Sequence, residues 1–504
     1  MADPMTQARA LLKEHFGYDS FRPAQEELIT ALLSGRDVLG IMPTGAGKSM
    51  CYQIPALLLP GITLVVSPLI SLMQDQVRAL KAAGIRGAYL NSSLTYKQYL
   101  LALENARNGM YKIIYVAPER LETGEFRRFA AEMDISLLAV DEAHCVSQWG
   151  HDFRPSYMEI APFVASLPRR PVTAAFTATA TPAVREDILT HLRLGDPLIK
   201  VTGFDRENLT FRVLRPTDKK KTLLEFIHQH PGDSGIVYCA TRKNVERVAA
   251  WLREQGINAL GYHAGMREED RREGKNRFLF DEVQVMVATN AFGMGIDKRN
   301  VGYVVHYNMP KNMESYYQEA GRAGRDGAPA ECLLLYGDGD VRLQEFLIRA
   351  SIKDLEPGEA ARREAVEKEK LRRMQDYCKT TGCLRHDILS YFGEQSPDRC
   401  ENCGNCLARK SARTARILTR LRQPGEERSL YDLLRGIRKD YAQRAGLPPE
   451  LIFSDRTLQA MASERPQNEH DMLEIPGVSP AKYQLYGRPF LRAIQRNNHR
   501  RSGL

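Results

Sequence analysis

Short runs of aliphatic and β-branched residues alternate with amphipathic, helix-like stretches over residues 34–197. The runs show little polar alternation, which is typical of strands that are buried on both faces. They occupy residues 38–42, 62–67, 113–117, 135–140 and 172–176. Because such strands alternate with helices, the pattern predicts a doubly wound parallel sheet.

The same rhythm begins again near residue 205. The expected elements are strands over residues 235–239, 284–289, 301–306 and 332–336, and a helix over 245–255. A second α/β domain is therefore expected to follow the first, with the join within residues 203–210.

After residue 339 the pattern becomes helical and polar. Residues 360–375 mix basic and acidic side chains, as in a solvated helix, whereas 407–423 hold six basic residues and no acidic one. Residues 429–496 have helical periodicity, and Ser454 is a candidate N-cap before 457–462. The domains expected in chain order are two α/β domains at 1–205 and 206–340, a helical segment at 341–406, a basic linker at 407–428, a small all-α domain at 429–497 and a tail at 498–504.

The composition is that of a folded protein. Of 504 residues, 43% are hydrophobic and 26% are charged, which excludes wholesale disorder. The net charge of +9 favours an anionic partner and is weak evidence for nucleic acid. No apolar run approaches the ~18 residues of a membrane span. The first residues lack a signal-peptide pattern, so we expect a cytoplasmic protein without a membrane partner.

Nine cysteines in such a chain predict a metal site and no disulfide framework. Cys51, Cys145, Cys239 and Cys332 stand alone, as buried small residues do. The other five are crowded into 29 positions: Cys378, Cys383, Cys400, Cys403 and Cys406. The last four of these supply thiolates for tetrahedral Zn²⁺, and an iron–sulfur cluster is the competing interpretation. Four thiolates leave no open position for water, which indicates a structural site.

The first strand runs into a glycine-containing loop at residues 43–49 that ends in Lys48 and Ser49. Glycines let backbone amides surround phosphate oxygens, and the helix that starts there adds its positive end. Lys48 is expected at the β- and γ-phosphates, and the Ser49 hydroxyl is expected to ligate Mg²⁺. Met42 stands where the strict phosphate-loop pattern has its first glycine, so a simple glycine turn is the alternative.

Two acidic residues follow the expected strand 135–140 directly. Ligands of open α/β sheets bind at the carboxyl ends of strands, where Asp141 and Glu142 would lie. Asp141 is expected to hold hydrated Mg²⁺, and Glu142 to orient and deprotonate the attacking water. Two acidic residues in a loop are usually only exposed to solvent. Here they follow a strand and lie downstream of the loop that contains Lys48, which favours a catalytic role.

In the second α/β domain, small residues separate Arg322 from Arg325. Spaced three apart, the two guanidinium groups would lie on one helix face and could stabilise the charge on a transferring phosphoryl group. The alternative is a basic surface helix that forms salt bridges, and the small spacers favour close approach to another surface.

These residues resemble a known family. Residues 43–49, 141–144, 176–180, 288–297 and 318–326 fall in the order of the superfamily-two helicase motifs. Residues 16–25 resemble the adenine-recognition segment of RecQ DNA helicases, and 147–157 resemble their aromatic-rich loop. The resemblance covers nearly the whole chain to Cys406, and again residues 429–496. It implies two tandem RecA-like domains, a helical zinc-binding segment and a small all-α domain.

The resemblance implies an ATP- and Mg²⁺-dependent 3′→5′ DNA helicase. Tyr18, Arg22 and Gln25 would contact the adenine end, and Arg325 is the first choice for arginine finger, ahead of Arg322. His144 completes the catalytic acidic motif. The further nucleotide contacts that it implies are Thr44, Gly45, Ala46, Gly47, Gly295 and Asp297. In these helicases the position of Met42 is not restricted to glycine.

The loop 147–157 is the main candidate for DNA contact. It places aromatic residues among polar ones beside the acidic motif, and an exposed aromatic ring stacks on bases at ~1–3 kcal/mol each. In the alternative, Trp149 anchors the loop in the core. The residues expected to meet DNA are Gln148, Trp149, His151, Phe153, Arg154, Ser67 and Thr241. Hydroxyls such as those of Ser67 and Thr241 suit phosphate contact but are also common helix caps.

The resemblance favours zinc at Cys383, Cys400, Cys403 and Cys406, with Cys378 as a bystander. Longer members then carry a winged-helix module of about a hundred residues, a usual domain size. Only 22 residues separate Cys406 from Ser429, too few for that module, so we expect unwinding either to be weaker or to rely on the first two domains and the zinc segment. Residues 429–496 resemble the helicase-and-RNase-D C-terminal (HRDC) domain. Their segment 475–482 is either a helix–hairpin–helix turn that accepts a phosphate or a plain turn. Auxiliary DNA contact is favoured by Arg488, Arg492, Arg496, Arg500 and Arg501.

The function expected from all of this is translocation on single-stranded DNA and unwinding of tailed or forked duplexes in DNA repair, recombination and replication. The cofactors are ATP, Mg²⁺ and Zn²⁺. A monomer near the nucleoid is expected, with a single-strand-binding protein as a candidate partner. The alternatives are an RNA helicase on the same two-domain engine and a non-catalytic nucleic-acid-binding scaffold.

Overall fold

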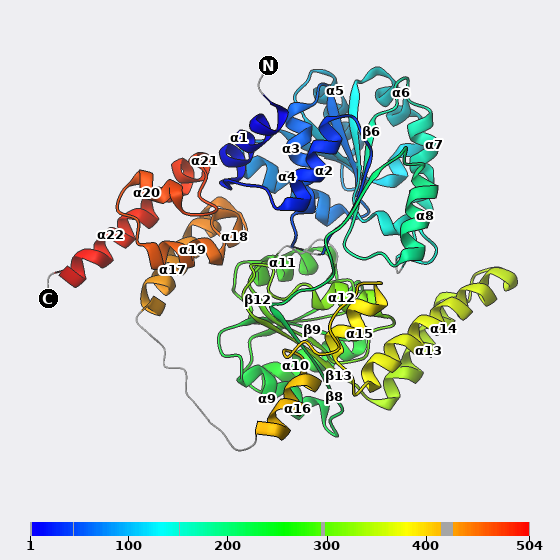
Figure 1. Ribbon diagram of the computed structural model, residues 1–504, viewed down its shortest axis with the longest axis vertical. Helices are drawn as coiled ribbons and strands as arrows, with labels where there is room; N and C mark the ends of the chain where they lie inside the picture. The colour runs from blue at the N-terminus through cyan, green and yellow to red at the C-terminus, as the bar shows by residue number, and fades with distance from the viewer. Residues whose placement is uncertain (1–2, 44, 151, 294–297, 415–426, 503–504) are drawn as a thin grey trace. The chain divides into compact units, whose positions relative to one another are not determined.

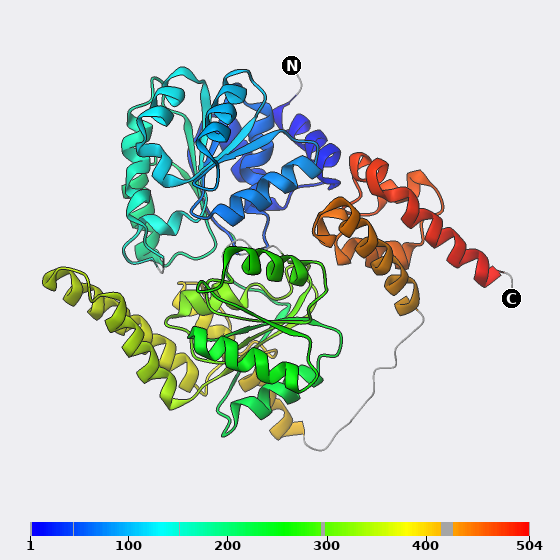
Figure 2. The same cartoon turned by 180° about the vertical axis from the view of Figure 1, so that it is seen from behind.

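The computed structural model describes residues 3–43, 45–150, 152–293, 298–414 and 427–502. Contacts divide the chain into two units. The first is Met1–Gly203 together with Pro424–Leu504, and the second is Phe204–Gln423. Figures 1 and 2 show the elements of each unit from opposite sides.

The first unit contains a seven-stranded sheet in the order β3-β4-β2-β5-β6-β1-β7. All its strand pairs are parallel. The strands are β1 (Val38–Ile41), β2 (Ile62–Val66), β3 (Gly87–Leu90), β4 (Ile113–Val116), β5 (Ile135–Val140), β6 (Val172–Thr177) and β7 (Leu198–Val201). The carboxyl ends of β1, β5 and β6 therefore meet at one edge, where ligands of such sheets bind.

Helices cover both faces of this sheet. One face packs on α2 (Pro23–Leu33), α3 (Lys48–Leu58) and α4 (Ile70–Ala82), in a core that includes Tyr52 and Phe176. Figure 1 shows α6, α7 and α8 on the other side of the sheet from α2 and α3. The remaining helices are α1 (Pro4–Phe16), α5 (Tyr96–Arg107), α6 (Gly124–Glu132), α7 (Ile160–Ala165), α8 (Pro182–Leu192) and the short turns η1 (Pro118–Glu122), η2 (Ala143–Val146) and η3 (Pro155–Glu159).

The second unit repeats the design with six parallel strands in the order β10-β11-β9-β12-β13-β8. The strands are β8 (Leu209–Leu214), β9 (Ser234–Tyr238), β10 (Ala259–Tyr262), β11 (Val285–Ala288), β12 (Val301–His306) and β13 (Ala330–Leu335). Leu223 and Phe226 of one helix and Val248 of another pack on this sheet. The helices are α9 (Lys219–His228), α10 (Arg242–Glu254), α11 (Glu268–Leu279) and α12 (Met313–Ala320).

A helical segment follows the second sheet. Its helices are α13 (Asp338–Ser351), α14 (Pro357–Lys379), α15 (Leu384–Tyr391) and α16 (Gly404–Thr414). Both views show α13 and α14 side by side as a long hairpin (Figures 1 and 2). The predicted solvated helix over 360–375 lies within α14. Residues 407–414 of the predicted linker 407–428 belong to α16, and residues 427 and 428 belong to the helix Glu427–Ala445. Residues 415–426 lie outside the described residues.

The C-terminal helices enclose a small core of their own. Arg438 is buried and pairs with Asp455 at 2.6 Å, and its Nη1 donates to the Phe453 carbonyl at 2.9 Å. Ser454 caps its helix as predicted, because its side chain accepts from the Thr457 N–H. The helices are α17 (Glu427–Ala445), α18 (Pro449–Ile452), α19 (Asp455–Glu464), α20 (Glu469–Glu474), α21 (Pro480–Lys482), η4 (Tyr483–Gly487) and α22 (Arg488–Ser502).

The predicted fold class, two doubly wound parallel sheets followed by helical segments, is confirmed. Four strands escaped the sequence pattern: β3, β7, β8 and β10. All four are the outermost strands of their sheets and are only partly buried. An edge strand packs against fewer neighbours, so it lacks the continuous apolar run of a central strand.

Asp37, which directly precedes β1, generates a prediction about stability. Its carboxylate is 2% exposed, pairs with Arg170, and accepts from the N–H groups of Thr173 and Gly195, both at 2.8 Å. Asp37→Ala would leave these buried donors unsatisfied. We expect the free energy of unfolding to fall by about 2–4 kcal/mol, measured from the urea midpoint.

The control for this experiment is Glu132→Ala, which breaks an exposed pair with Arg107. Exposed pairs contribute about 0–1 kcal/mol. A midpoint shift for Asp37→Ala no larger than that of the control would contradict the assigned role.

Candidate functional site

The phosphate loop lies between β1 and α3. Gly45 and Gly47 have φ values of 85° and 83°, a left-handed conformation that glycine adopts at no steric cost. Gly47 caps α3, so the first amides of that helix face the loop. The Lys48 Nζ donates to the Met42 carbonyl at 3.1 Å, and the Met42 side chain is buried in the core. Thr44 lies outside the described residues.

Gln25 and Arg22, predicted to contact adenine, hold this loop from the start of α2. The Gln25 Nε2 donates to the carbonyls of Ala46 and Gly47 at 3.2 and 3.1 Å. Arg22 Nη1 donates to the Gly45 carbonyl at 3.2 Å. A Cβ atom on Gly47 would lie 2.4 Å from the Gln25 amide, so the close contact requires glycine. The ring of Tyr18 is 39% exposed, as a stacking platform for a base must be.

Asp141 and Glu142 follow β5 at the edge where β1 also ends. The Asp141 N–H continues the sheet by donating to the Val66 carbonyl at 2.9 Å. Glu142 has a φ of 49°, a left-handed conformation that is uncommon outside glycine and is concentrated at functional sites. Burial and the charge of Glu142 raise the pKa of Asp141 to about 7, although Lys48 opposes the shift. The pair thus forms a concentrated negative site beside Lys48.

His144, the last residue of the acidic motif, links it to β6. Its ring is buried, and Nδ1 lies 2.8 Å from the Thr177 hydroxyl oxygen and 3.4 Å from Glu142 Oε2. Burial and the charges of Lys48 and Arg154 lower the pKa of His144 to about 3. The neutral ring donates from Nδ1, since the Thr177 hydroxyl itself donates to the Thr179 carbonyl. Sequence reasoning missed Thr177 as a partner, although it named the segment 176–180.

The aromatic-rich loop is attached directly to this motif. A Cβ atom on Gly150 would lie 2.4 Å from the His144 carbonyl oxygen. The Trp149 N–H donates to the Ser147 hydroxyl at 3.1 Å, and that hydroxyl donates to Asp187 at 2.6 Å. The Trp149 side chain is 51% exposed, so the alternative in which it anchors the loop in the core is wrong. The exposed ring is available for stacking on a base.

The other predicted DNA contacts differ in exposure. Arg154 pairs with Asp152 at 3.1 Å and donates to the Pro68 carbonyl at 2.8 Å, which ties the loop to the segment after β2. Gln148 is exposed and Phe153 half-buried, whereas His151 lies outside the described residues. Ser67 is fully buried. Thr241 caps α10 by accepting from the Asn244 N–H at 3.2 Å.

Arg322 and Arg325 lie in the second unit, in turns beyond the end of α12 at Ala320. The prediction that they share a helix face is therefore wrong, because α12 ends at Ala320 with Gly321 as its C-cap, before either arginine. Arg322 is 5% exposed and lies against Gly293, where a Cβ atom would be 3.1 Å from its Nη2. Arg325 is half-buried. Gly295 and Asp297 lie outside the described residues.

The four cysteines predicted to bind metal come together in the second unit. The sulfurs of Cys383, Cys400, Cys403 and Cys406 all lie within 4.8 Å of one another, and those of Cys383 and Cys403 are 3.9 Å apart. Zn–S bonds of about 2.3 Å in a tetrahedron need sulfurs about 3.8 Å apart, so the site fits zinc. Burial raises the pKa of the Cys400 thiol, but hydrogen bonds from the Asn402 amide and neighbouring thiols bring it to about 7.

Cys378 is not part of this cluster. It is buried in α14, and burial raises the pKa of its thiol far above the usual range. A thiol in such surroundings stays protonated and is a poor metal ligand.

Two parallel sheets, one with a phosphate loop and an acidic motif and the other with paired arginines, define the class of helicase-type ATPases. Family models match in chain order: DEAD/DEAH box helicase at residues 22–188, helicase conserved C-terminal domain at 218–327, RecQ zinc-binding at 338–407 and HRDC domain at 427–494. Within the described residues no helix is long and apolar enough to cross a bilayer.

Curated relatives identify the family. The chain is 39% identical to the ATP-dependent DNA helicase RecQ of Bacillus subtilis, over 97% of this chain and 98% of that protein. It is 36% identical to the ATP-dependent DNA helicase RecQ of Haemophilus influenzae, over 97% of this chain and 96% of that protein. The chain belongs to the RecQ family of ATP-dependent DNA helicases. It is an ATP-dependent DNA helicase, so the RNA-helicase and scaffold alternatives are set aside. The RecQ zinc-binding model and the cysteine cluster favour zinc over the iron–sulfur alternative.

The alignment with the Bacillus protein spans 593 positions, more than the 504 residues of this chain. That relative therefore carries residues without a counterpart here, in agreement with the short stretch between Cys406 and Ser429.

Solved structures share the fold at lower identity. Mycobacterium smegmatis helicase Lhr, bound to ssDNA and AMP-PNP, has a TM-score of 0.55 at 17% identity over 92% of this chain and 74% of that chain. Dbp5 of Saccharomyces cerevisiae, bound to RNA and ADP BeF3, has a TM-score of 0.54 at 18% sequence identity, over 74% of this chain and 98% of that chain.

The zinc site predicts that Cys403→Ser loses bound metal, whereas Cys378→Ser keeps it. Both thiols are buried, but only Cys403 belongs to the cluster. Binding of a structural metal contributes directly to folding, so the second unit of Cys403→Ser is expected to unfold at a lower temperature. Elemental analysis and calorimetry measure the two effects. Metal loss in Cys378→Ser, or full retention in Cys403→Ser, would contradict the assignment.

Proposed function

We propose that this RecQ helicase translocates 3′→5′ on single-stranded DNA and unwinds tailed or forked duplexes in DNA repair, recombination and replication. The feature that supports the proposal most is the attachment of an exposed tryptophan loop to a buried acidic motif. Gly150 lies on the His144 carbonyl, so a movement of the Trp149 loop on DNA is passed to Glu142 and Asp141.

The proposed chemistry assigns each residue of the first unit a role. Lys48 contacts the β- and γ-phosphates, and the amides at the start of α3 surround them. Glu142 orients the attacking water and accepts its proton, while neutral His144, which donates from Nδ1 to Thr177, holds the acidic motif against β6. Gln25 and Arg22 keep the loop in shape, and Tyr18 offers an exposed ring to the adenine.

Mg²⁺ fits the carboxylate pair. Burial and mutual repulsion raise the pKa of Asp141, which marks a site that a cation would stabilise. Asp141 and Ser49 are the residues that would hold the ion, which neutralises phosphate charge when bound.

The second unit supplies Arg322 and Arg325 to the transferring phosphoryl group in this proposal, with Arg325 as the arginine finger. A permanently charged planar guanidinium suits charge that is spread over several oxygens. ATP would then draw the two units together and hydrolysis would release them, which converts a chemical cycle into a step along the strand.

We also propose action as a monomer at the nucleoid, with a single-strand-binding protein as partner. Without room for a winged helix after Cys406, strand separation would depend on the two sheets and the zinc segment.

Polarity is the direct test of this function. Duplexes with identical sequence and either a 3′ or a 5′ single-stranded tail are compared in a fluorescent strand-separation assay with ATP and Mg²⁺. We expect the 3′-tailed duplex to be unwound at least about tenfold faster, and chelation of Mg²⁺ to stop unwinding. Faster unwinding of the 5′-tailed duplex would contradict the proposed direction.

Trp149→Ala tests the coupling between DNA and the ATP site. We expect loss of most of the DNA stimulation of ATP hydrolysis, because a stacked base contributes about 1–3 kcal/mol, whereas hydrolysis without DNA stays near the wild-type rate. Trp251→Phe, at a partly buried tryptophan on α10, is the matched control. Unchanged stimulation by single-stranded DNA in Trp149→Ala would show that the loop does not report DNA binding.

A further inference from the structure

The segment 204–210 enters the second unit and ends in the outermost strand β8. Its Arg206 donates to three carbonyls of the loop that carries Arg322 and Arg325. The distances from the guanidinium are 3.3 Å to Gly321, 3.0 Å to Ala323 and 2.8 Å to Gly324. The Arg206 guanidinium therefore bonds the backbone on both sides of Arg322, at Gly321 before it and at Ala323 and Gly324 after it.

Asn208 contacts the same loop beside Arg206. Its Nδ2 donates to the carbonyls of Gly324 and Ala328 at 2.9 and 2.8 Å, and its Oδ1 accepts from Arg206 Nε at 3.2 Å. Gly324 has a φ of 56°, and a Cβ atom there would lie 2.4 Å from Asn208 Nδ2. Five hydrogen bonds from two side chains thus converge on this turn.

The loop needs such bonds because it is not helical. The last carbonyls of a helix have no partner within it, and α12 ends at Ala320. Loop amides already bond the last carbonyls of α12, because the N–H groups of Gly321, Arg322 and Ala323 donate to Tyr317, Glu319 and Ala320. Arg206 instead donates to carbonyls of the turn that follows the helix. Without Arg206, the carbonyls of Gly321 and Ala323 in this largely buried turn would lose their donor, whereas Gly324 would keep the bonds from Asn208 and Gly327. The turn would then no longer hold Arg322 and Arg325 in one position.

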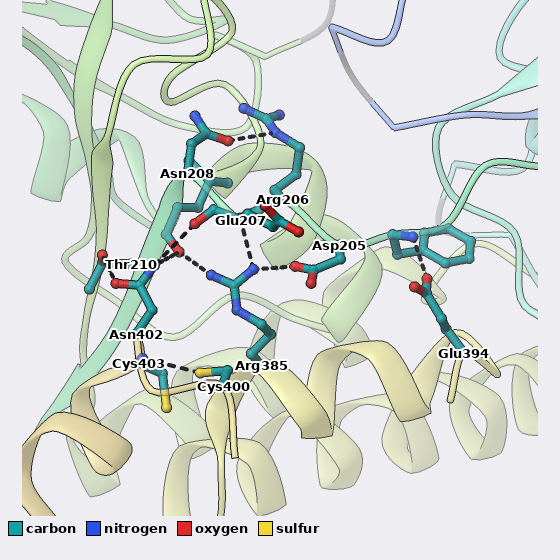
Figure 3. Close-up of polar contacts among 12 residues, drawn as sticks. Asp205, Arg206, Glu207, Asn208, Thr210, Arg385, Glu394, Cys400, Asn402 and Cys403 are labelled. Atoms are coloured by element: carbon teal, nitrogen blue, oxygen red, sulfur yellow. Dashed lines mark hydrogen bonds and ion pairs between the residues drawn. The ribbon is translucent and has the colours of Figure 1, made fainter. Parts of the chain in front are cut away.

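Residues around the zinc ligands hold the other side of the segment (Figure 3). Arg385 pairs with Asp205 and donates to the carbonyls of Arg206 and Leu209 at 2.8 and 2.5 Å. Asn402, between Cys400 and Cys403, donates to the Glu207 carbonyl at 3.1 Å and accepts from the Thr210 hydroxyl at 2.9 Å.

The geometry points to Arg206 and Asn208 as positioning residues that hold the loop of Arg322 and Arg325 in place, with Arg385 fixing the segment from the zinc-binding side. This inference rests on the proposed role of Arg325 as arginine finger. The hydrogen bonds of Arg206 and Asn208 go to the backbone of that loop. They act by keeping the finger where the transition state requires it, and a shift of about 1 Å can cost about a hundredfold in rate.

Steady-state ATP hydrolysis with saturating single-stranded DNA tests the inference. Arg206→Ala is expected to lower kcat by about 10–100-fold and to change the KM for ATP by less than about threefold, because a finger acts in the transition state. Arg206→Lys, which keeps the charge but not the planar fork, is expected to recover only part of the loss. Arg212→Ala, on β8 with a partly exposed ion pair to Glu331, is the matched control.

A second measurement separates positioning from general damage to the fold. In a double-mutant cycle with Arg325→Ala, Arg206→Ala is expected to add little further loss of kcat, because both changes remove the same interaction. ADP is expected to bind Arg206→Ala as it binds the wild type, whereas ADP with aluminium fluoride binds more weakly. Zinc content is expected to stay at the wild-type value in Arg206→Ala, and kcat is expected to fall both in Arg206→Ala and in Arg385→Ala.

Different outcomes would overturn the positioning role of Arg206 and the proposed arginine finger Arg325. Wild-type kcat in Arg206→Ala, or losses that add fully to those of Arg325→Ala, would overturn the positioning role. Full kcat in Arg385→Ala would overturn the anchoring from the zinc-binding side. Full hydrolysis in Arg325→Ala would instead overturn the proposed arginine finger itself.

Discussion

The burial of Asp141, with the opposing charges of Glu142 and Lys48 acting on it, is the interaction on which the proposed catalytic arrangement depends. β5 pairs in parallel with β2 and β6, and β6 pairs in parallel with β1. The carboxyl ends of β5 and β1 therefore lie at the same edge of the sheet with one strand between them, which brings the acidic motif and the phosphate loop to one side of the sheet. Burial and the charge of Glu142 raise the pKa of Asp141 to about 7, so the ionised carboxylate is unfavourable unless a cation lies beside it. The surrounding bonds of His144, Gln25 and Arg22 then keep this pair and its loop in one geometry.

Two structural connections extend from this chemistry. In the first unit, the loop of Trp149 is attached through Gly150 to the backbone of His144, and through Arg154 to the segment after β2. In the second unit, Arg206 and Asn208 connect the arginine loop to residues that flank the zinc ligands. The residues that flank the zinc ligands are thereby connected to the loop that carries the proposed arginine finger.

Local patterns in the sequence were sufficient for much of this account. The phosphate loop, the acidic motif and the four cysteines are each defined within short stretches, and the central strands are continuous apolar runs. The edge strands β3, β7, β8 and β10 were missed because they are only partly buried. The helix expected around Arg322 and Arg325 was wrong, although the glycines at 321 and 324 were a visible signal for its end. Arg206 was beyond sequence reasoning, since it contacts carbonyls more than a hundred positions away.

The central claim is that a lysine of one unit and an arginine of the other meet the same phosphate. A crystal structure with ADP, aluminium fluoride, Mg²⁺ and 3′-tailed DNA measures this directly. The account predicts Lys48 Nζ and a guanidinium nitrogen of Arg325 each within about 3 Å of the fluoride group. A complex in which both Arg322 and Arg325 stay far from that group, with hydrolysis intact in solution, would contradict it.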